Sequence, residues 1–240
     1  MIRRKDAPAL FAAPNPFATD LTTLVQYWLF YGYDRWKAAT IAGNFDQRHE
    51  ADWEAVTIGF SAAKPLFVAY SEHCGGHWYN WSEIQVEPVV RTEGGEWKVI
   101  DAPTEPALHP LIAVAEGSHA NYLRSEDQRS PDWSSCGAHV SQATAGALSY
   151  VWNIRDRTGN GWTIFPKKIT PVDENTPPMS FRGYWGASDR ITVNNFRRPS
   201  LAVGKPGDGP AAPPKQRLWS APIETIFCSE HWHPRACSSQ

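Results

Sequence analysis

The sequence predicts a mainly β fold, a single-domain antiparallel β-sandwich with few helices and long loops. Apolar, β-branched and aromatic residues occur in short runs, and clusters of Gly, Pro, Asn and Asp separate these runs at short spacing. Only residues 141–154 have the spacing of apolar residues that is typical of a helix. Short strands joined by such turns favour an antiparallel sandwich.

The expected elements follow one another along a single domain. An Ala- and Pro-rich lead-in over residues 1–20 precedes an aromatic strand at 22–33. Further strands are expected at residues 54–60, 65–70, 81–90, 97–100 and 110–115, with weaker strand patterns at 164–170 and 191–193. Residues 199–214 contain five prolines and three glycines and predict a surface loop or connector. The domain therefore spans residues 21–222, and residues 223–240 form a C-terminal tail.

Composition excludes some classes of partner. The chain has 42% apolar and 20% charged residues and a net charge of -2, without a long run of either sign, so a nucleic-acid partner is not expected. The apolar stretch from Leu24 to Tyr33 is too short for a transmembrane segment. Met1 to Lys5 is basic but precedes no apolar stretch typical of a secretory signal. The compartment stays open: soluble, secreted or cytoplasmic.

Four cysteines, Cys74, Cys136, Cys228 and Cys237, lack the spacing of a zinc site. In an oxidising compartment Cys228 and Cys237 could form a disulfide bond across the C-terminal tail. Four free buried thiols are the equally weighted alternative.

The segment from His49 to Glu54 groups one imidazole and several carboxylates before a strand. Because side chains alternate along a strand, Asp52 and Glu54 should share one face while Trp53 packs on the other, and His49 can fold in from the preceding loop. Such an oxygen-rich set predicts a hard divalent cation, Mg²⁺, Ca²⁺ or Mn²⁺. The alternative is a solvated turn with one ion pair. Glu50 is expected to point away or to support the ligands.

Two further segments place histidines beside glycines. His73 follows a strand and precedes Gly75 and Gly76, which predicts either a loop that enters a cleft or an ordinary hairpin turn. His119 follows Gly117 and Ser118, but the serine-hydrolase motif is incomplete. We therefore expect His119 to support the site or to act as a general base.

Together these motifs resemble the necrosis-inducing protein (NPP1-like) superfamily and, more closely, the Vps62-related family. The first resemblance rests on the aromatic run ending at Asp34, on the His49 to Glu54 segment and on the turn at His73. The Vps62-like resemblance extends through residues 109–122, then 181–186, and Gly209-Pro210 ahead of Trp219, covering about residues 24–220.

The resemblance implies a β-sandwich that holds a divalent cation in a surface cavity. It implies Asp34, His49, Asp52 and Glu54 as metal-site residues and His73 as a nearby functional residue. Asp46 is the nearest alternative to Asp34 as a metal ligand. Glu50 and Ala51 differ from the matching positions of a heptapeptide motif that the superfamily has at this segment. This difference counts against the toxin activity of the necrosis-inducing branch more than against metal binding.

Three hypotheses follow. The first is a metal-dependent protein that binds a small polar ligand or a sugar- or phosphate-bearing lipid headgroup, with peripheral membrane contact. The second is a metal-dependent enzyme, a hydrolase, in which His73 or His119 transfers protons. The third is a structural cation in an interaction domain.

Overall fold

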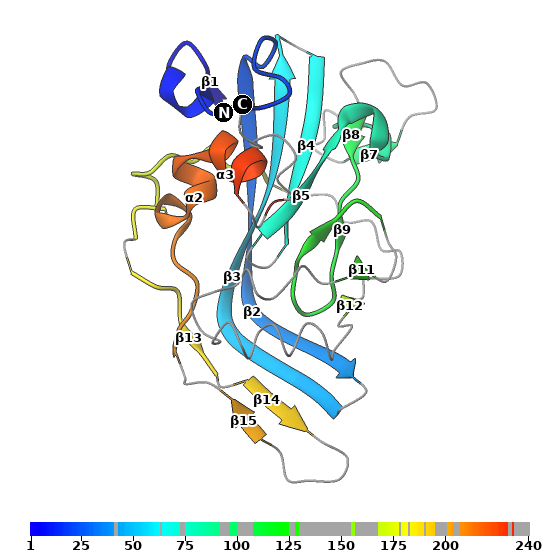
Figure 1. Ribbon diagram of the computed structural model, residues 1–240, viewed down its shortest axis with the longest axis vertical. Coiled ribbons are helices and arrows are strands. Elements are labelled where there is room, and N and C mark those ends of the chain that lie inside the picture. The colour runs from blue at the N-terminus through cyan, green and yellow to red at the C-terminus, as the bar shows by residue number, and fades with distance from the viewer. Residues whose placement is uncertain are drawn as a thin grey trace.

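The computed structural model shows a largely antiparallel β protein (Figure 1). The described residues are 1–40, 43–62, 64–72, 75–91, 97–99, 108–124, 128–129, 155–156, 168–177, 179–181, 183–189, 191–194, 201–203, 207–229 and 232. The strands are β1 Ile2–Arg3, β2 Thr23–Thr40, β3 Gly43–Ser61, β4 Lys64–Glu72, β5 Gly75–Asn80, β6 Val86–Arg91, β7 Trp97–Val99, β8 Leu108–Pro110, β9 Ala113–Val114, β10 Asn121–Tyr122, β11 Gln128–Arg129, β12 Arg155–Asp156, β13 Ala187–Ser188, β14 Ile191–Asn194, β15 Leu201–Val203 and β16 Gly207–Asp208. The helices are α2 Arg217–Ser220 and α3 Pro222–Cys228, with 3-10 helices at Pro8–Phe11, Trp81–Glu83 and Pro213–Lys215.

A long antiparallel hairpin of β2 and β3 forms the centre of the largest described sheet (Figure 1). Its register stays constant from the Thr23–Phe60 pair to the Thr40–Gly43 pair. On the other edge of β3, β4 pairs from Val56 onward, whereas β13 pairs at His49 and β14 pairs nearer the hairpin end. On this edge of β3, the segment with Asp52 and Glu54 therefore lies between the part that pairs with β13 and the part that pairs with β4.

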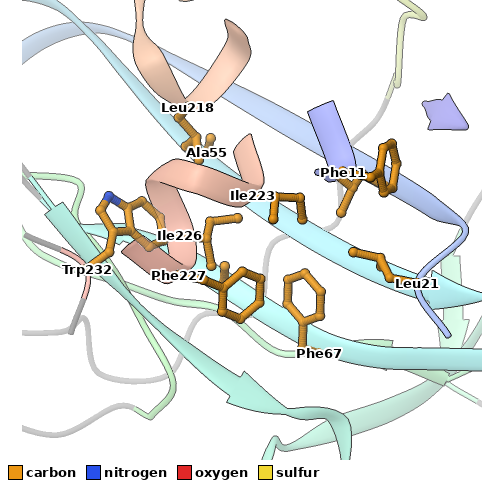
Figure 2. Close-up of a cluster of buried hydrophobic side chains, with 11 residues drawn as sticks. Phe11, Leu21, Ala55, Phe67, Leu218, Ile223, Ile226, Phe227 and Trp232 are labelled. Atoms are coloured by element: carbon orange, nitrogen blue, oxygen red, sulfur yellow. The ribbon is translucent and has the colours of Figure 1, made fainter. Parts of the chain in front are cut away.

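One face of the hairpin packs against the C-terminal helices (Figure 1). The α3 sequence places Ile223, Ile226 and Phe227 on one stripe and begins with proline, which is suited to the first helical position. Figure 2 shows this stripe beside Phe67 of β4. The cluster consists of Phe11, Leu21, Leu24, Ala55, Phe67, Ala69, Leu218, Ile223, Ile226, Phe227 and Trp232. Burying each large apolar side chain contributes about 1.5–3 kcal/mol.

The opposite face of the hairpin carries a second cluster. Val56 and Ile58 of β3 pack with Val68 and Tyr70 of β4, because residues paired across antiparallel strands share a face. Ile84 closes this cluster. The small sheet of β9 and β10 lies on the same side, against β3 and β4. This face holds the candidate site.

The mainly β fold with antiparallel sheets is confirmed for the described residues, whereas two sheets packed as a sandwich stay a prediction. The expected strands at 22–33 and 54–60 are parts of the much longer β2 and β3. The expected strand at 81–90 is wrong in its first part, because Asn80 and Glu83 form a capping box that starts a 3-10 helix.

Other differences concern the shorter elements. The expected strand at 110–115 is divided between β8 and β9, and the expected loop at 199–214 contains β15 and β16. The stretch 97–100 holds β7, and 191–193 falls within β14. Residues 168–170 form no strand, and the expected helix at 141–154 lies outside the described residues. Among the described helices, none combines the length and the apolar character needed to cross a membrane.

Cys228 at the end of α3 is disulfide-bonded. The alternative of four free thiols is therefore wrong. Its partner lies outside the described residues, as Cys74, Cys136 and Cys237 all do, so the pairing with Cys237 stays a prediction.

Candidate metal centre

A break in β3 brings two carboxylates together that regular strands would separate. Asp34 pairs with His49 across the hairpin, and Asp52 pairs with Tyr31, so strict alternation would place the two aspartates on opposite faces. Ala51 adopts the left-handed conformation with a φ of 58° and interrupts the alternation. One oxygen from each aspartate then lies in a common group with a nitrogen of His119.

The loop between β9 and β10 supplies His119. Gly117 has a φ of 86° and His119 a φ of 57°, so the chain turns sharply here. The His119 amide donates to the Ala115 carbonyl at 3.2 Å, which closes the turn. The Arg35 amide donates to the Gly117 carbonyl at 3.0 Å and ties the loop to β2. These bonds fix the loop against the strand that carries Asp34.

We call Asp34, Asp52 and His119 the Asp-Asp-His group. Their ligand atoms all lie within 4.8 Å of one another. His119 Nδ1 is 3.1 Å from Asp52 Oδ2 and 4.0 Å from Asp34 Oδ2. Both aspartates are buried, with 5% and 9% of their surface exposed. Two carboxylates this close repel each other unless a cation lies between them, and the donor set could hold a divalent metal ion.

His49 lies beside this group and is part of β3, not of a preceding loop. Its Nδ1 is 2.6 Å from the Ala51 carbonyl oxygen, which can only accept, so Nδ1 carries the proton. Its Nε2 lies 3.7 Å from Asp34 Oδ2. In a neutral imidazole that nitrogen presents a lone pair to the carboxylate. A cation between them, or a proton on Nε2, would make this approach favourable.

Glu54 is almost completely buried and is held by Ser71. The Ser71 hydroxyl donates a hydrogen bond to Glu54 Oε2. Its oxygen accepts a hydrogen bond of 2.7 Å from the backbone amide of Ala55. The side-chain amide of Asn121 lies 3.5 Å from the same hydroxyl oxygen. Glu54 is therefore fixed by strand β4 and by the start of β10.

Burial raises the pKa of Glu54 well above its ordinary value of 4.5, and the negative charge of Asp52 raises it further. The Ser71 hydroxyl opposes this rise, while Glu72 and Asp34 add to it. Glu72 is itself buried and its Oε2 lies 2.7 Å from His77 Nδ1. Four buried carboxylates thus share this face of the sheet.

An aromatic ring packs against the imidazole of His119. Tyr31 stacks on His119 with ring centroids 3.9 Å apart and an interplanar angle of 3°. Burial, followed by the charges of Glu54 and Asp52, raises the pKa of the Tyr31 hydroxyl to about 12. Tyr31 therefore stays neutral near the group at ordinary pH.

Trp53 packs on the face of β3 opposite Asp52 and Glu54, as the sequence predicts. Its ring lies 4.7 Å from that of Phe30 and 5.7 Å from that of Trp185. Glu50 is exposed and accepts the Ala187 amide at 3.1 Å, so it supports β13 and lies outside the Asp-Asp-His group.

The residues named from the sequence occupy different positions in the site. Asp34 and Asp52 join the group, whereas His49 lies beside it and Glu54 is bound to Ser71. His119, expected as a supporting residue or a base, is the nitrogen donor of the group. His73 lies outside the described residues.

Asp46, the alternative to Asp34 as a metal ligand, forms ion pairs with two arginines. Its Oδ2 lies 2.8 Å from Arg48 and 3.2 Å from Arg35. The hydrogen bond from Arg48 is the main cause that lowers the pKa of Asp46 to about 2. Asp46 is thus satisfied without a metal ion.

Sequence reasoning missed Tyr31, Ser71 and Asn121. Tyr31 is one of many aromatics in its run, and Ser71 directly precedes the Glu72-His73 pair without any metal-ligand pattern. Asn121 lies two residues after His119 in the same segment, again without a metal-ligand pattern of its own. Their roles arise from contacts between distant strands.

Comparisons with protein-family models, with curated proteins and with solved structures found no match for this chain. The resemblance to the Vps62-related family stays a prediction.

Proposed function

We propose that this chain binds a divalent cation through Asp34, Asp52 and His119. The observation that carries the proposal is a pair of buried carboxylates beside one partly exposed imidazole, with their ligand atoms within 4.8 Å of one another. A buried pair of negative charges is costly without a compensating cation. The donors come from β2, β3 and the loop before β10, and hydrogen bonds hold that loop in place.

The donor set favours a hard ion. Carboxylate oxygens are the preferred ligands of Mg²⁺, Ca²⁺ and Mn²⁺, and His119 adds a single nitrogen. Ca²⁺ takes about six to eight ligands and Mg²⁺ about six. Three protein donors, or four with His49, leave positions that water or an oxygen-rich ligand could fill.

The open positions support a binding function. We infer that the cation anchors a sugar- or phosphate-bearing group, such as a lipid headgroup, at the protein surface. Side chains of His119 and His49 keep partial exposure, 17% and 19%, so the group can be approached from solvent. The resemblance to the Vps62-related family within the necrosis-inducing protein superfamily, with its β-sandwich and metal cavity, supports the same proposal.

Vesicle binding tests the proposal. Vesicles of phosphatidylcholine, alone or with phosphatidylserine or a glycosylated sphingolipid, are sedimented with the protein in Ca²⁺ or in EDTA. We expect binding to one of the supplemented vesicles in Ca²⁺, and loss of binding in EDTA and in Asp52→Ala. The control Asp46→Asn removes a carboxylate from the same strand outside the Asp-Asp-His group and should bind normally. Binding that persists in EDTA and in Asp52→Ala would refute the proposal.

A metal-dependent hydrolase is the second candidate. The observation that favours it is the contact between buried Glu72 and His77, because a carboxylate that orients one imidazole nitrogen is a common acid-base arrangement. His119 is less suited to proton transfer, since its Nδ1 faces both aspartates. Turnover of a nitrophenyl phosphate or ester that needs metal and is lost in His77→Ala would support this candidate. No turnover in any metal would reject it.

A further inference from the structure

The backbone of His119 is held in a conformation that non-glycine residues seldom adopt. Its φ of 57° lies in the left-handed region. Strained residues persist where the surrounding contacts determine them, and they occur often at binding sites. Here the loop is closed by the bond from His119 to Ala115 and is tied to β2 through Gly117. The backbone therefore directs the imidazole toward the hairpin.

The backbone alone does not fix the plane of the imidazole ring. Tyr31 does so, because its ring is almost parallel to that of His119 at a centroid distance of 3.9 Å. Tyr31 also pairs directly with Asp52 across the hairpin, so both side chains lie on the same face. The 3.1 Å contact to Asp52 then sets the rotation of the imidazole within that plane.

We infer that Tyr31 is a positioning residue that presents His119 Nδ1 as the nitrogen ligand and so sets which cations the site prefers. This inference rests on the proposed metal-binding function. Imidazole ligands favour Ni²⁺ and related ions, whereas Ca²⁺ depends on oxygen ligands. A misplaced imidazole should therefore weaken Ni²⁺ binding much more than Ca²⁺ binding.

Calorimetric titration of the full chain with Ni²⁺ and, separately, with Ca²⁺ tests the inference. Tyr31→Phe keeps the ring and should bind both ions within about 2-fold of the unaltered chain. Tyr31→Leu removes the stack and should lose about 10-fold or more in Ni²⁺ affinity, as expected when support for a ligand is lost, but little in Ca²⁺ affinity. His119→Ala should show the same split between the two ions.

A control variant and a substitute variant separate a loss of imidazole positioning from a general loss of structure. Tyr33→Leu alters a half-exposed tyrosine two residues along the same strand and should leave both affinities unchanged. Tyr31→Met takes the place of Tyr31→Leu if the latter does not fold, as judged by circular dichroism.

The outcomes are distinct. Equal loss of Ni²⁺ and Ca²⁺ affinity in Tyr31→Leu would overturn the inference, because the loss of a merely structural side chain would weaken the binding of both ions. Loss in Tyr31→Phe as large as in Tyr31→Leu would assign the effect to the hydroxyl and would also overturn it. If the unaltered chain binds neither ion, the proposed function fails first and the inference fails with it.

Discussion

Metal binding to the Asp-Asp-His group should be visible as a change in thermal stability. Asp34 and Asp52 present oxygens within 4.8 Å of each other, and two unit charges at that distance repel by about 3.5 kcal/mol at an effective dielectric constant of about 20. A divalent cation between the two carboxylates attracts both of them, and this attraction outweighs their mutual repulsion. Asp52→Asn removes one of the charges and one charged ligand.

The size of the effect follows from mass action. A cation at 100 times its Kd stabilises the folded state by about 2.7 kcal/mol. For a chain of 240 residues, each kcal/mol raises the Tm by about 2–4 °C, so the unaltered chain should gain about 5–11 °C in saturating Ca²⁺ or Mn²⁺. Asp52→Asn should show almost no gain.

Asp52→Asn should also behave differently without metal. It relieves the repulsion of about 3.5 kcal/mol but weakens the contact to His119, and a hydrogen bond to a charged group contributes about 1.5–3 kcal/mol. The Tm of this variant in EDTA should therefore equal or exceed that of the unaltered chain. Differential scanning calorimetry in EDTA and in metal measures both effects.

Asp46→Asn is the matched control, because it loses a carboxylate on β3 that pairs with Arg35 and Arg48. Its gain in Tm on adding metal should match that of the unaltered chain. A full metal-induced gain in Asp52→Asn, or no gain in the unaltered chain, would refute the reasoning.

Three further predictions concern the support of the site and the core. Ser71→Ala leaves Glu54 without its hydroxyl donor and should cost about 1–3 kcal/mol in urea unfolding, whereas exposed Ser82→Ala should cost almost nothing. In EDTA, stability should fall as pH rises above about 4.5, because folded Glu54 retains a proton that the unfolded chain releases. Glu54→Gln should flatten that slope, and an unchanged slope would contradict the pKa assignment. Phe227→Ala should lower the free energy of unfolding by about 3–5 kcal/mol in the same urea assay, and a loss below 1 kcal/mol would contradict its place in the core.

The local pattern of β3 was predictable, but its partners were not. Period-two alternation correctly placed Trp53 behind Asp52. That Asp34 meets Asp52 depends on the positive φ of Ala51, and alanine gives no sequence signal for that conformation. His119 lies in a loop more than sixty residues from Asp52 in the sequence, and no local pattern specifies that the two residues meet.

The extent of the elements was also hard to predict. Beyond Tyr33 the hairpin continues through charged residues such as Arg35 and Arg48, so the apolar pattern ends long before the strands do. Helix α3 is short, and its stripe of Ile223, Ile226 and Phe227 gives too few turns for a helical period to stand out. Tertiary packing decides these elements more than local preference does.

The most direct test of the central claim is an anomalous difference map from crystals grown with Mn²⁺. The account predicts one peak in contact with carboxylate oxygens of Asp34 and Asp52 and with His119 Nδ1, and no such peak in crystals of Asp52→Asn. A peak that touches none of these residues, or an absent peak at a Mn²⁺ concentration that saturates the calorimetric titration, would contradict it.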